Sequence, residues 1–397
     1  MADKSEKPAI RFAGFTDAWE QRKVGELLIE RNEQAPMSDE YPLMAFISNE
    51  GVAPKGDRYD RSSLVSDTEN KPYKRTDFGD FIYSSNNLET GSIGLNKYGK
   101  ASISPVYSIF QPTGIADSDF LGRRLVRKDF INAMVKWRQG VIYGQWRIHE
   151  SDFIKIEIPV PSVDEQRKIG AFLDGLDNLI TLHQREYDKL QNVKKSMLEK
   201  MFPKNGSNIP EIRFAGFTDA WEQRKFADMA TRNSGMAVCS SNIPSVEYED
   251  IVSGQGILNK DIREKSNIRS GIRFEPGDVL FGKLRPYLKN WILPNFSGVA
   301  VGDFWVLHPF ETDSRYLYYL IQTPAFQTAA NQSTGTKMPR SDWNLVSKAI
   351  FFSPKDITEQ RKIGATLQSI DHLITLHQRE LEKLKNLKKA CLEKMFV

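Results

Sequence analysis

A long internal duplication constrains this chain more than any other feature of its sequence. The segment IRFAGFTDAWEQRK occurs at Ile10–Lys23 and again, unchanged, at Ile212–Lys225. Three shorter segments recur in the same order, namely EQRKIGA at 165–171 and 359–365, LITLHQRE at 179–186 and 373–380, and LEKMF at 198–202 and 392–396. A chain that repeats its framework in this way is expected to fold as two similar halves.

The segments between these repeated blocks differ, but weak similarities run through them in a constant order. Gly79-Asp80 matches Gly277-Asp278, Asp117-Ser118 matches Asp313-Ser314, and Ser151-Asp152 matches Ser341-Asp342. We therefore expect one mixed α/β fold, used twice with different surfaces. Short apolar runs predict strands at 80–83, 106–110, 154–158, 279–281 and 299–307, and helical periodicity predicts helices at 118–137 and 314–327.

The later repeated blocks predict one long helix in each half, of about 38 residues. Ser162 and Asp356 stand at capping positions, and a glutamate follows each three residues later, which is the pattern of a reciprocal capping box. Apolar residues recur at steps of three and four, so the helices carry a heptad seam and are expected to pack on each other antiparallel. The packing residues are predicted to include Leu173, Leu176, Ile180, Leu190, Leu367, Ile370, Ile374 and Leu384.

Two polar residues interrupt each seam at equivalent positions. They are His183 and Lys194 in the first helix, and His377 and Lys388 in the second. We interpret the histidines as polar breaks that fix the register of the helix pair, because no histidine of the chain has the spacing of a metal site. No metal ligand and no metal cofactor is predicted.

Composition and length define the broad class. The chain has 397 residues, a net charge of +4 and two cysteines, so we expect two or three domains and no disulfide framework. No apolar run approaches a membrane span and no signal peptide is apparent, which predicts a soluble cytoplasmic protein. The expected boundaries are a leader at 1–23, a first domain at 24–160, a helix at 161–203, a linker and second leader at 204–225, a second domain at 226–354, and a helix at 355–397.

Catalytic signatures are missing from the sequence. Residues 94–101 approach the phosphate-loop pattern, but Ala101 stands where a hydroxyl should bind magnesium, and no helix is expected to follow. We find no nucleophile elbow, no zinc-protease motif and no NPPY or DPPY tetrapeptide. No catalytic residue is predicted.

Basic residues mixed with aromatic and glycine residues in the variable segments favour nucleic-acid contact. Arginine and glutamine are common base readers, and lysine commonly holds phosphate. The alternative is that these are ordinary solvated loops. The candidates for DNA binding are Lys97, Lys100, Gln145, Arg147, Lys283, Arg285, Lys289, Lys337 and Arg340.

Taken together, the duplicated leader, the duplicated EQRKIGA and LITLHQRE blocks, and GDVLFGKLRPYLK ahead of GTKMPR resemble the specificity subunit of bacterial type I restriction-modification enzymes. The resemblance covers nearly the whole chain. It implies an α+β fold with a pseudo-two-fold repeat, in which two similar target-recognition domains are separated by two long antiparallel coiled-coil helices. The first domain lacks the KLRPY stretch, so a role of Arg285 is not transferred to it.

The resemblance also implies a function and partners. Each recognition domain would read one half of an asymmetric double-stranded DNA target, and the helices would set the spacer and dock two methyltransferase subunits. S-adenosylmethionine, ATP and magnesium would be bound by partner modification and restriction subunits, and this chain would bind no cofactor. Two alternatives remain open, namely a coiled-coil interaction scaffold without DNA readout and, disfavoured by the absent motifs, a self-sufficient nuclease or methyltransferase.

Overall fold

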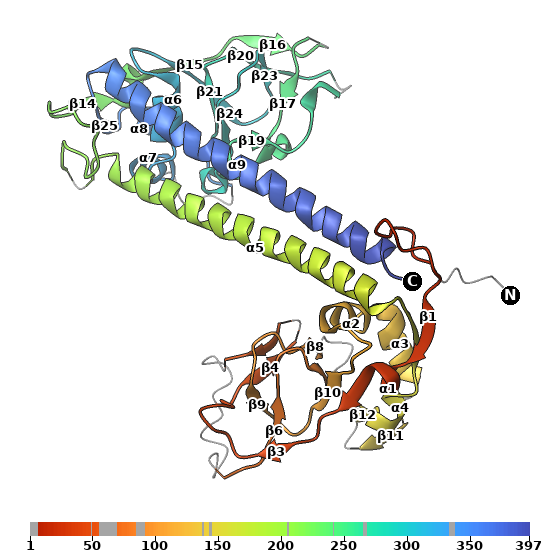
Figure 1. The fold of residues 1–397 in the computed structure, drawn as a ribbon. Coiled ribbons are helices and arrows are strands. Elements are labelled where there is room, and N and C mark those ends of the chain that lie inside the picture. The colour runs from red at the N-terminus through yellow and green to blue at the C-terminus, as the bar shows by residue number, and fades with distance from the viewer. Residues whose placement is uncertain are drawn as a thin grey trace. The chain divides into compact units, whose positions relative to one another are not determined.

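The computed structural model describes residues 7–48, 50–54, 70–84, 92–136, 139–142, 145–204, 206–240, 242–264, 268–332 and 338–397, with 139–142 and 145–147 described by their backbone (Figure 1). The chain forms two compact units. Unit 1 comprises residues 1–182 and 382–397, and unit 2 comprises residues 183–381. No helix among the described residues has the apolar length needed to cross a bilayer.

Unit 1 is a mixed fold of short strands and helices. Its elements before the long helix are β1 (Glu20–Lys23), α1 (Val24–Leu27), β2 (Leu28–Glu30), β3 (Gln34–Ala35), β4 (Ala45–Ile47), β5 (Gly51–Ala53), β6 (Tyr73–Thr76), β7 (Phe81–Tyr83), β8 (Ile93–Leu95), β9 (Ala101–Ile103), β10 (Ser108–Pro112), α2 (Ser118–Arg124), α3 (Lys128–Lys136), β11 (Gln139–Ile142), β12 (Gln145–Arg147), α4 (Glu150–Phe153) and β13 (Glu157–Val160). The main sheet has the order β2-β10-β7-β8.

Unit 2 repeats this plan. Its elements are β14 (Glu222–Lys225), η4 (Phe226–Asp228), β15 (Ala230–Asn233), β16 (Met236–Val238), β17 (Ser245–Val246), η5 (Tyr248–Asp250), β18 (Ile251–Val252), β19 (Ile257–Leu258), η6 (Ile262–Glu264), β20 (Ser270–Phe274), β21 (Val279–Gly282), η7 (Pro286–Leu288), β22 (Trp291–Ile292), β23 (Gly298–Ala300), β24 (Phe304–Pro309), α6 (Ser314–Leu320), α7 (Pro324–Ala330), α8 (Trp343–Val346) and β25 (Ile350–Ser353). The main sheet has the order β15-β24-β21-β22, and a second sheet has the order β16-β20-β23-β17.

The two main sheets confirm that the variable segments share one fold. Strands β7 and β21 stand at equivalent places and form equivalent antiparallel pairs, with β10 and β24 respectively. Asp117 caps α2 and Asp313 caps α6, each carboxylate accepting hydrogen bonds from backbone amides of the first turn. The repeated leader ends in a strand that pairs antiparallel with the last strand of its own unit, β1 with β13 and β14 with β25.

The predicted long helices are present as α5 (Val163–Lys200) and α9 (Ile357–Lys394), each of 38 residues. In unit 2, His183 lies against His377 and Lys194 against Asp371, so residue numbers rise along α5 as they fall along α9. The helices therefore pair antiparallel. All eight predicted packing residues are buried or half-buried.

The duplicated leader is fastened to the start of the long helix by the same ion pair in each unit. Arg11 grips Glu165 with two hydrogen bonds of 2.8 and 2.6 Å, and Arg213 grips Glu359 with two of 2.7 and 2.9 Å. The predicted capping box is therefore wrong in one of its two contacts: the glutamate side chain pairs with the leader arginine and not with the backbone amide of the capping residue. A charged, bidentate guanidinium is a stronger partner for the glutamate than a single backbone amide, so the carboxylate turns toward the leader.

Each predicted helix of the variable segments is in fact two short helices. The run 118–137 divides into α2 and α3, and Arg124 at the end of α2 turns inward to Asp129 of α3. The run 314–327 divides into α6 and α7, where the Thr323 hydroxyl caps α7 and Pro324 takes its first position. A proline cannot continue a preceding helix but fits the first turn of a new one.

Three predicted strands also have other bounds. The run 299–307 is two strands, β23 and β24, because Gly302 makes a turn with φ of 98°. The run 154–158 becomes a strand only at Glu157, since the amide of Ile154 bonds back to Glu150 in the turn that closes α4. The run 106–110 becomes a strand at Ser108, after a turn in which the amide of Tyr107 bonds to Ser104.

Candidate nucleic-acid interface

The loop that joins β21 to β22 in unit 2 combines positive charge with backbone strain. Residues 283–290 include three basic residues and no acidic one. Arg285 and Lys289, on either side of η7, adopt left-handed conformations with φ of 48° and 56°. This conformation costs a residue with a side chain about 1–2 kcal/mol and is common at functional sites.

A second segment holds this loop in place. Arg340 forms an isolated antiparallel bridge with Leu284, and the amide of Arg285 donates to the carbonyl of Pro339 at 2.7 Å. The amide of Ser341 donates to the carbonyl of Lys283 at 2.8 Å. Two basic segments that are 55 residues apart in the sequence (285 and 340) are thus joined by main-chain bonds. The strained loop is fixed by these bonds.

Tyr248 joins the start of this loop to the residue that precedes β24. Its hydroxyl accepts a hydrogen bond from the amide of Leu284 at 2.9 Å and donates to the carbonyl of Asp303 at 2.7 Å. Burial raises the pKa of Tyr248 well above its ordinary value, so the phenol stays protonated and can act as a donor.

The side chains of Lys283 and Arg340 converge on the carboxylate of Asp303. Lys283 Nζ lies 3.5 Å from Oδ1, and Arg340 Nη2 lies 3.0 Å from Oδ2. Burial opposes ionisation of Asp303, but the hydrogen bond and charge of Arg340, with the charge of Lys283, hold its pKa below the usual value. Arg340 is 54% exposed, so this cluster faces solvent.

The other two cations of the loop follow Lys283 in the sequence. Arg285 and Lys289 are both exposed, and so are Tyr287 and Met338. Unit 2 therefore presents four of the predicted DNA-binding residues, Lys283, Arg285, Lys289 and Arg340, on two adjoining segments. We call this group the basic loop surface. Arginine, lysine and an exposed aromatic ring on a fixed backbone are suited to contact phosphates and bases.

The predicted candidates of unit 1 are not gathered in this way. Lys97 pairs with Asp119 at 3.1 Å and with Asp174 of α5 at 2.7 Å. Burial alone would lower the pKa of Lys97, but these two carboxylates raise it. Lys100 pairs with Glu40 and lies over the ring of Tyr41. Both lysines are about half exposed, at 52%, and both are held by intramolecular ion pairs.

Residues 94–101 are not a phosphate loop. They run from the end of β8 through a turn closed by Asn96, whose side chain accepts from the amides of Tyr98 and Gly99. Strand β9 follows, where nucleotide binding would require a helix. Of the other candidates, Gln145 and Arg147 lie in β12, which pairs with β11, and only their backbone is described. Lys337 lies outside the described residues.

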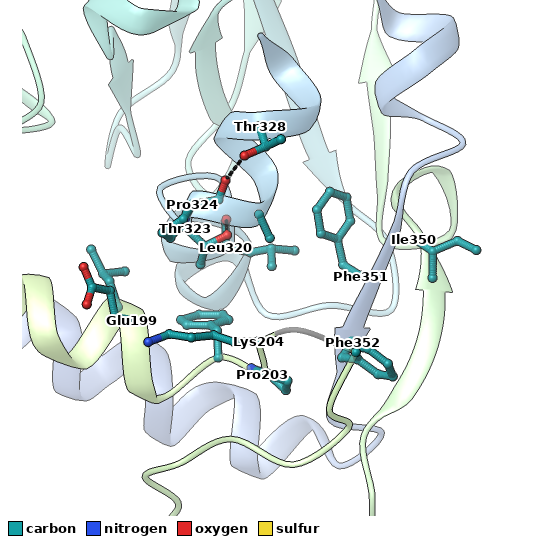
Figure 2. A pocket seen from close by; sticks show the side chains of 14 residues that line it. Glu199, Pro203, Lys204, Leu320, Thr323, Pro324, Thr328, Ile350, Phe351 and Phe352 are labelled. Carbon is teal, nitrogen blue, oxygen red and sulfur yellow. Dashed lines mark hydrogen bonds between the residues drawn. The ribbon is translucent and has the colours of Figure 1, made fainter. Parts of the chain in front are cut away.

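A separate cavity of about 390 Å³ lies in unit 2 beside the end of α5 (Figure 2). Its lining is mostly apolar and includes Leu320, Phe351 and Phe352, with Glu199 and Lys204 among its polar residues. In Figure 2 the one hydrogen bond drawn is internal to α7, from the hydroxyl of Thr328 to the carbonyl of Pro324 at 2.9 Å. This set offers no pairing of a nucleophile with a base. No group of three metal-ligating side chains occurs in the described part of the chain.

Tyr248 and Asp303 were missed by sequence reasoning. Tyr248 is 36 residues from Leu284, and Asp303 is 37 from Arg340. No local pattern links them, so only the tertiary fold shows their part in the site. Asp177 and Asp371, the partners of Lys388 and Lys194, were missed as well. In that case a signal existed, because these aspartates repeat at the same offset of 194 as the lysines.

The chain is similar to known proteins of one family. Residues 17–192 match the type I restriction modification DNA specificity domain. The type I restriction enzyme MjaVIII specificity subunit of Methanocaldococcus jannaschii is 23% identical, over 94% of this chain and 90% of the relative. The MjaIX specificity subunit of the same organism is 22% identical, over 61% of this chain and 60% of the relative.

A solved structure has the same fold. It is the S subunit of the type I restriction-modification system of M. genitalium, which aligns with a TM-score of 0.63 and 14% identity. The alignment covers 98% of this chain and 99% of the other. At this identity the match establishes the fold.

Proposed function

This chain belongs to the type I restriction-modification specificity subunits, and from that premise we propose that it is a non-catalytic reader of double-stranded DNA. Each of its two recognition domains, 24–160 and 226–354, reads one half of an asymmetric, bipartite target. The two long helices set the unspecified spacer and dock two methyltransferase subunits. The chain thereby directs both methylation and restriction.

The observation that carries this proposal is a fixed framework bearing different surfaces. The ion pairs of Arg11 and Arg213 and the order of the main sheets are the same in both units. The sequences of the variable segments differ, in contrast: the stretch between β21 and β22 is KLRPYLKN (283–290), and the stretch between β7 and β8 is SSNNLETGS (84–92), which has no basic residue. Two readers that share a scaffold but differ in their contact residues are what a split, asymmetric target requires.

Catalysis and cofactors belong to partner chains in this proposal. The methyltransferase subunits would bind S-adenosylmethionine, and restriction subunits would use ATP and magnesium to move along DNA and cut it. This chain supplies sequence information and geometry and binds double-stranded DNA without a cofactor. The complex would act in the cytoplasm, where the DNA is.

A coiled-coil scaffold that binds only proteins is the second candidate. The strained loop and its exposed cations argue against this candidate. A surface of this kind would need an acidic partner protein, whereas duplex DNA offers the required negative charge on every phosphate. Binding of duplex DNA that weakens steeply with salt would separate the two candidates, because neutralised phosphates release counterions.

The decisive experiment maps methylated adenines in cells that express this chain with its methyltransferase subunits. Residues 24–160 are then replaced by the corresponding domain of another family member. We expect a split motif of which one half changes after the replacement while the other half and the spacer stay the same. A change in both halves, or methylation without a sequence motif, would contradict the modular reading.

A further inference from the structure

One acidic residue pairs with two cations of the basic loop surface. The carboxylate of Asp303 lies between the ammonium of Lys283 and the guanidinium of Arg340, at 3.5 and 3.0 Å. A carboxylate and a phosphate diester each carry one negative charge shared over two oxygens. Arginine recognises both in the same way, with N–H groups aimed at a pair of oxygens. Asp303 therefore resembles a backbone phosphate in its charge and in the groups that it binds.

The backbone holds Asp303 in this position. Its carbonyl accepts hydrogen bonds from the amide of Lys283 at 2.8 Å and from the hydroxyl of Tyr248 at 2.7 Å. Gly302, with φ of 98°, forms the turn that directs Asp303 toward the loop before β24 begins. The carboxylate of Asp303 is thus held against Lys283 of the 283–290 loop, which has no acidic residue, and against Arg340 of the second segment.

The ion pairs are open to competition. The side chains of Lys283, Asp303 and Arg340 are 31%, 27% and 54% exposed. Ion pairs at this exposure are weak and screened by salt, so another anion can displace the carboxylate. The lowered pKa of Asp303 shows that its charge is present at neutral pH, when such a competition would occur.

We propose that Lys283 and Arg340 form a phosphate-binding subsite of the DNA interface, and that Asp303 occupies this subsite until duplex DNA displaces it. The proposal rests on the DNA-reading function proposed above and adds a regulatory element to it. Because every duplex offers the same phosphates, the carboxylate opposes binding to all sequences equally. A non-target duplex, which makes fewer base contacts, depends on phosphates for a larger share of its affinity. Asp303 then weakens binding of target and non-target duplexes by the same factor, and so shortens retention on non-target DNA without changing the ratio of the two affinities.

The test compares two variants in the complete complex with its methyltransferase subunits. Asp303→Asn keeps the shape and the main-chain bonds but removes the competing charge. Glu311→Gln is the matched control, because it also removes one negative charge and an arginine partner, Arg224. Glu311 lies beyond the opposite end of β24, about 20 Å away along the strand. Affinity is measured for a target duplex and for a scrambled duplex, across a salt series.

We expect Asp303→Asn to bind the scrambled duplex roughly two- to tenfold more tightly, as release of a weak ion pair predicts. The methylated motif should stay the same, and Glu311→Gln should bind as the parent does. Equal gains in both variants would reduce the effect to net charge and overturn the proposal, as would unchanged binding by Asp303→Asn. Weaker target binding with one relaxed motif position would overturn it too, by making Asp303 a base reader, for instance of the cytosine amino group. If the parent complex binds no duplex, the proposed function itself fails.

Discussion

A single hydroxyl group connects three segments of the basic loop surface. Tyr248 accepts from the amide of Leu284 and donates to the carbonyl of Asp303, and the loop that starts at Leu284 bridges to Arg340. Without the hydroxyl, the amide of Leu284 and the carbonyl of Asp303 each lose a partner at a partly buried position. An unpaired polar group in such a place costs about 1–3 kcal/mol.

We therefore expect Tyr248→Phe to lower the free energy of unfolding by about 1–3 kcal/mol, measured by urea denaturation. It should also weaken DNA binding, because the strained conformations of Arg285 and Lys289 lose part of their support. The control is Tyr287→Phe, in the same loop, whose ring is 54% exposed. A loss of stability in the control as large as in Tyr248→Phe would show that the hydroxyl bridge has no special role.

At this scale the sequence predicted the cations but not what organises them. Lys283, Arg285 and Arg340 were recognisable by residue type and by their glycine and proline neighbours. Asp303 and Tyr248 look unremarkable in the sequence, because their contacts are with residues more than thirty positions away. The ion pairs that hold Lys97 and Lys100 were not foreseen for the same reason.

The long helices carry their polar seam residues as matched pairs. In unit 2 the ammonium of Lys194 lies 2.7 Å from Asp371, whose other oxygen accepts a hydrogen bond from Tyr319 at 2.8 Å. In unit 1 Lys388 pairs with Asp177. His183 and His377, each the equivalent of the other, meet through their Nδ1 atoms at 3.0 Å. Such pairs favour one alignment of two antiparallel helices over alignments shifted by a turn.

Removing one member of the Lys194–Asp371 pair should lower the free energy of unfolding more than removing both members. The Lys194 side chain is 9% exposed, so Asp371→Ala leaves an ammonium buried without its anion. We expect this variant to lose about 2–4 kcal/mol of stability, and Lys194→Met in the same background to restore much of it. A double-mutant cycle by urea denaturation measures the coupling.

The control for this cycle is an exposed pair on the same helix. Glu186 and Lys189 lie 3.6 Å apart and are 50% and 69% exposed, so Glu186→Ala should cost less than about 1 kcal/mol. If Asp371→Ala costs no more than Glu186→Ala, the Lys194 pair does not define the register.

Periodicity predicted these helices and their seam well, because the heptad pattern runs for 38 residues in each copy. The short elements were predicted less accurately. The run 314–327 was predicted as one helix but forms two, with the break at Thr323-Pro324. The run 299–307 was predicted as one strand but forms two, with a turn at Gly302. These elements are too short for periodicity to locate their ends, and local turns decide them.

At the scale of the whole molecule, the duplication predicted two similar units. It did not predict which helix end contacts the leader of each unit. In unit 1 the amide of Ile10 bonds to the carbonyl of Lys394, near the end of the chain. In unit 2 the equivalent amide of Ile212 bonds to Lys200 at the end of α5. The first leader thus contacts the end of α9, and the second leader contacts the end of α5. A linear pattern cannot reveal this, because Ile10 and Lys394 lie 384 positions apart in the sequence.

The proposal that the long helices set the spacer between the half-sites can be tested by lengthening both helices. Seven residues that preserve the seam are inserted after Leu190 in α5, and seven after Ile374 in α9. Both insertions lie between the His183–His377 contact and the Lys194–Asp371 contact, so each pair keeps its heptad register. At 1.5 Å per residue, a helix gains about 10 Å, which corresponds to about three base pairs.

We expect the variant to methylate a motif with both half-sites unchanged and a spacer about three base pairs longer, as read from the positions of methylated adenines. The control carries the same seven residues after Gly206, in the connection between α5 and the second leader, where no helix is lengthened, and it should keep the original spacer. An insertion in α5 alone would shift its contacts against α9 by two turns and should abolish stable pairing. A folded and active double insertion that keeps the original spacer would mean that the helices do not determine the distance between half-sites, and that the recognition domains reach their sequences by some other constraint.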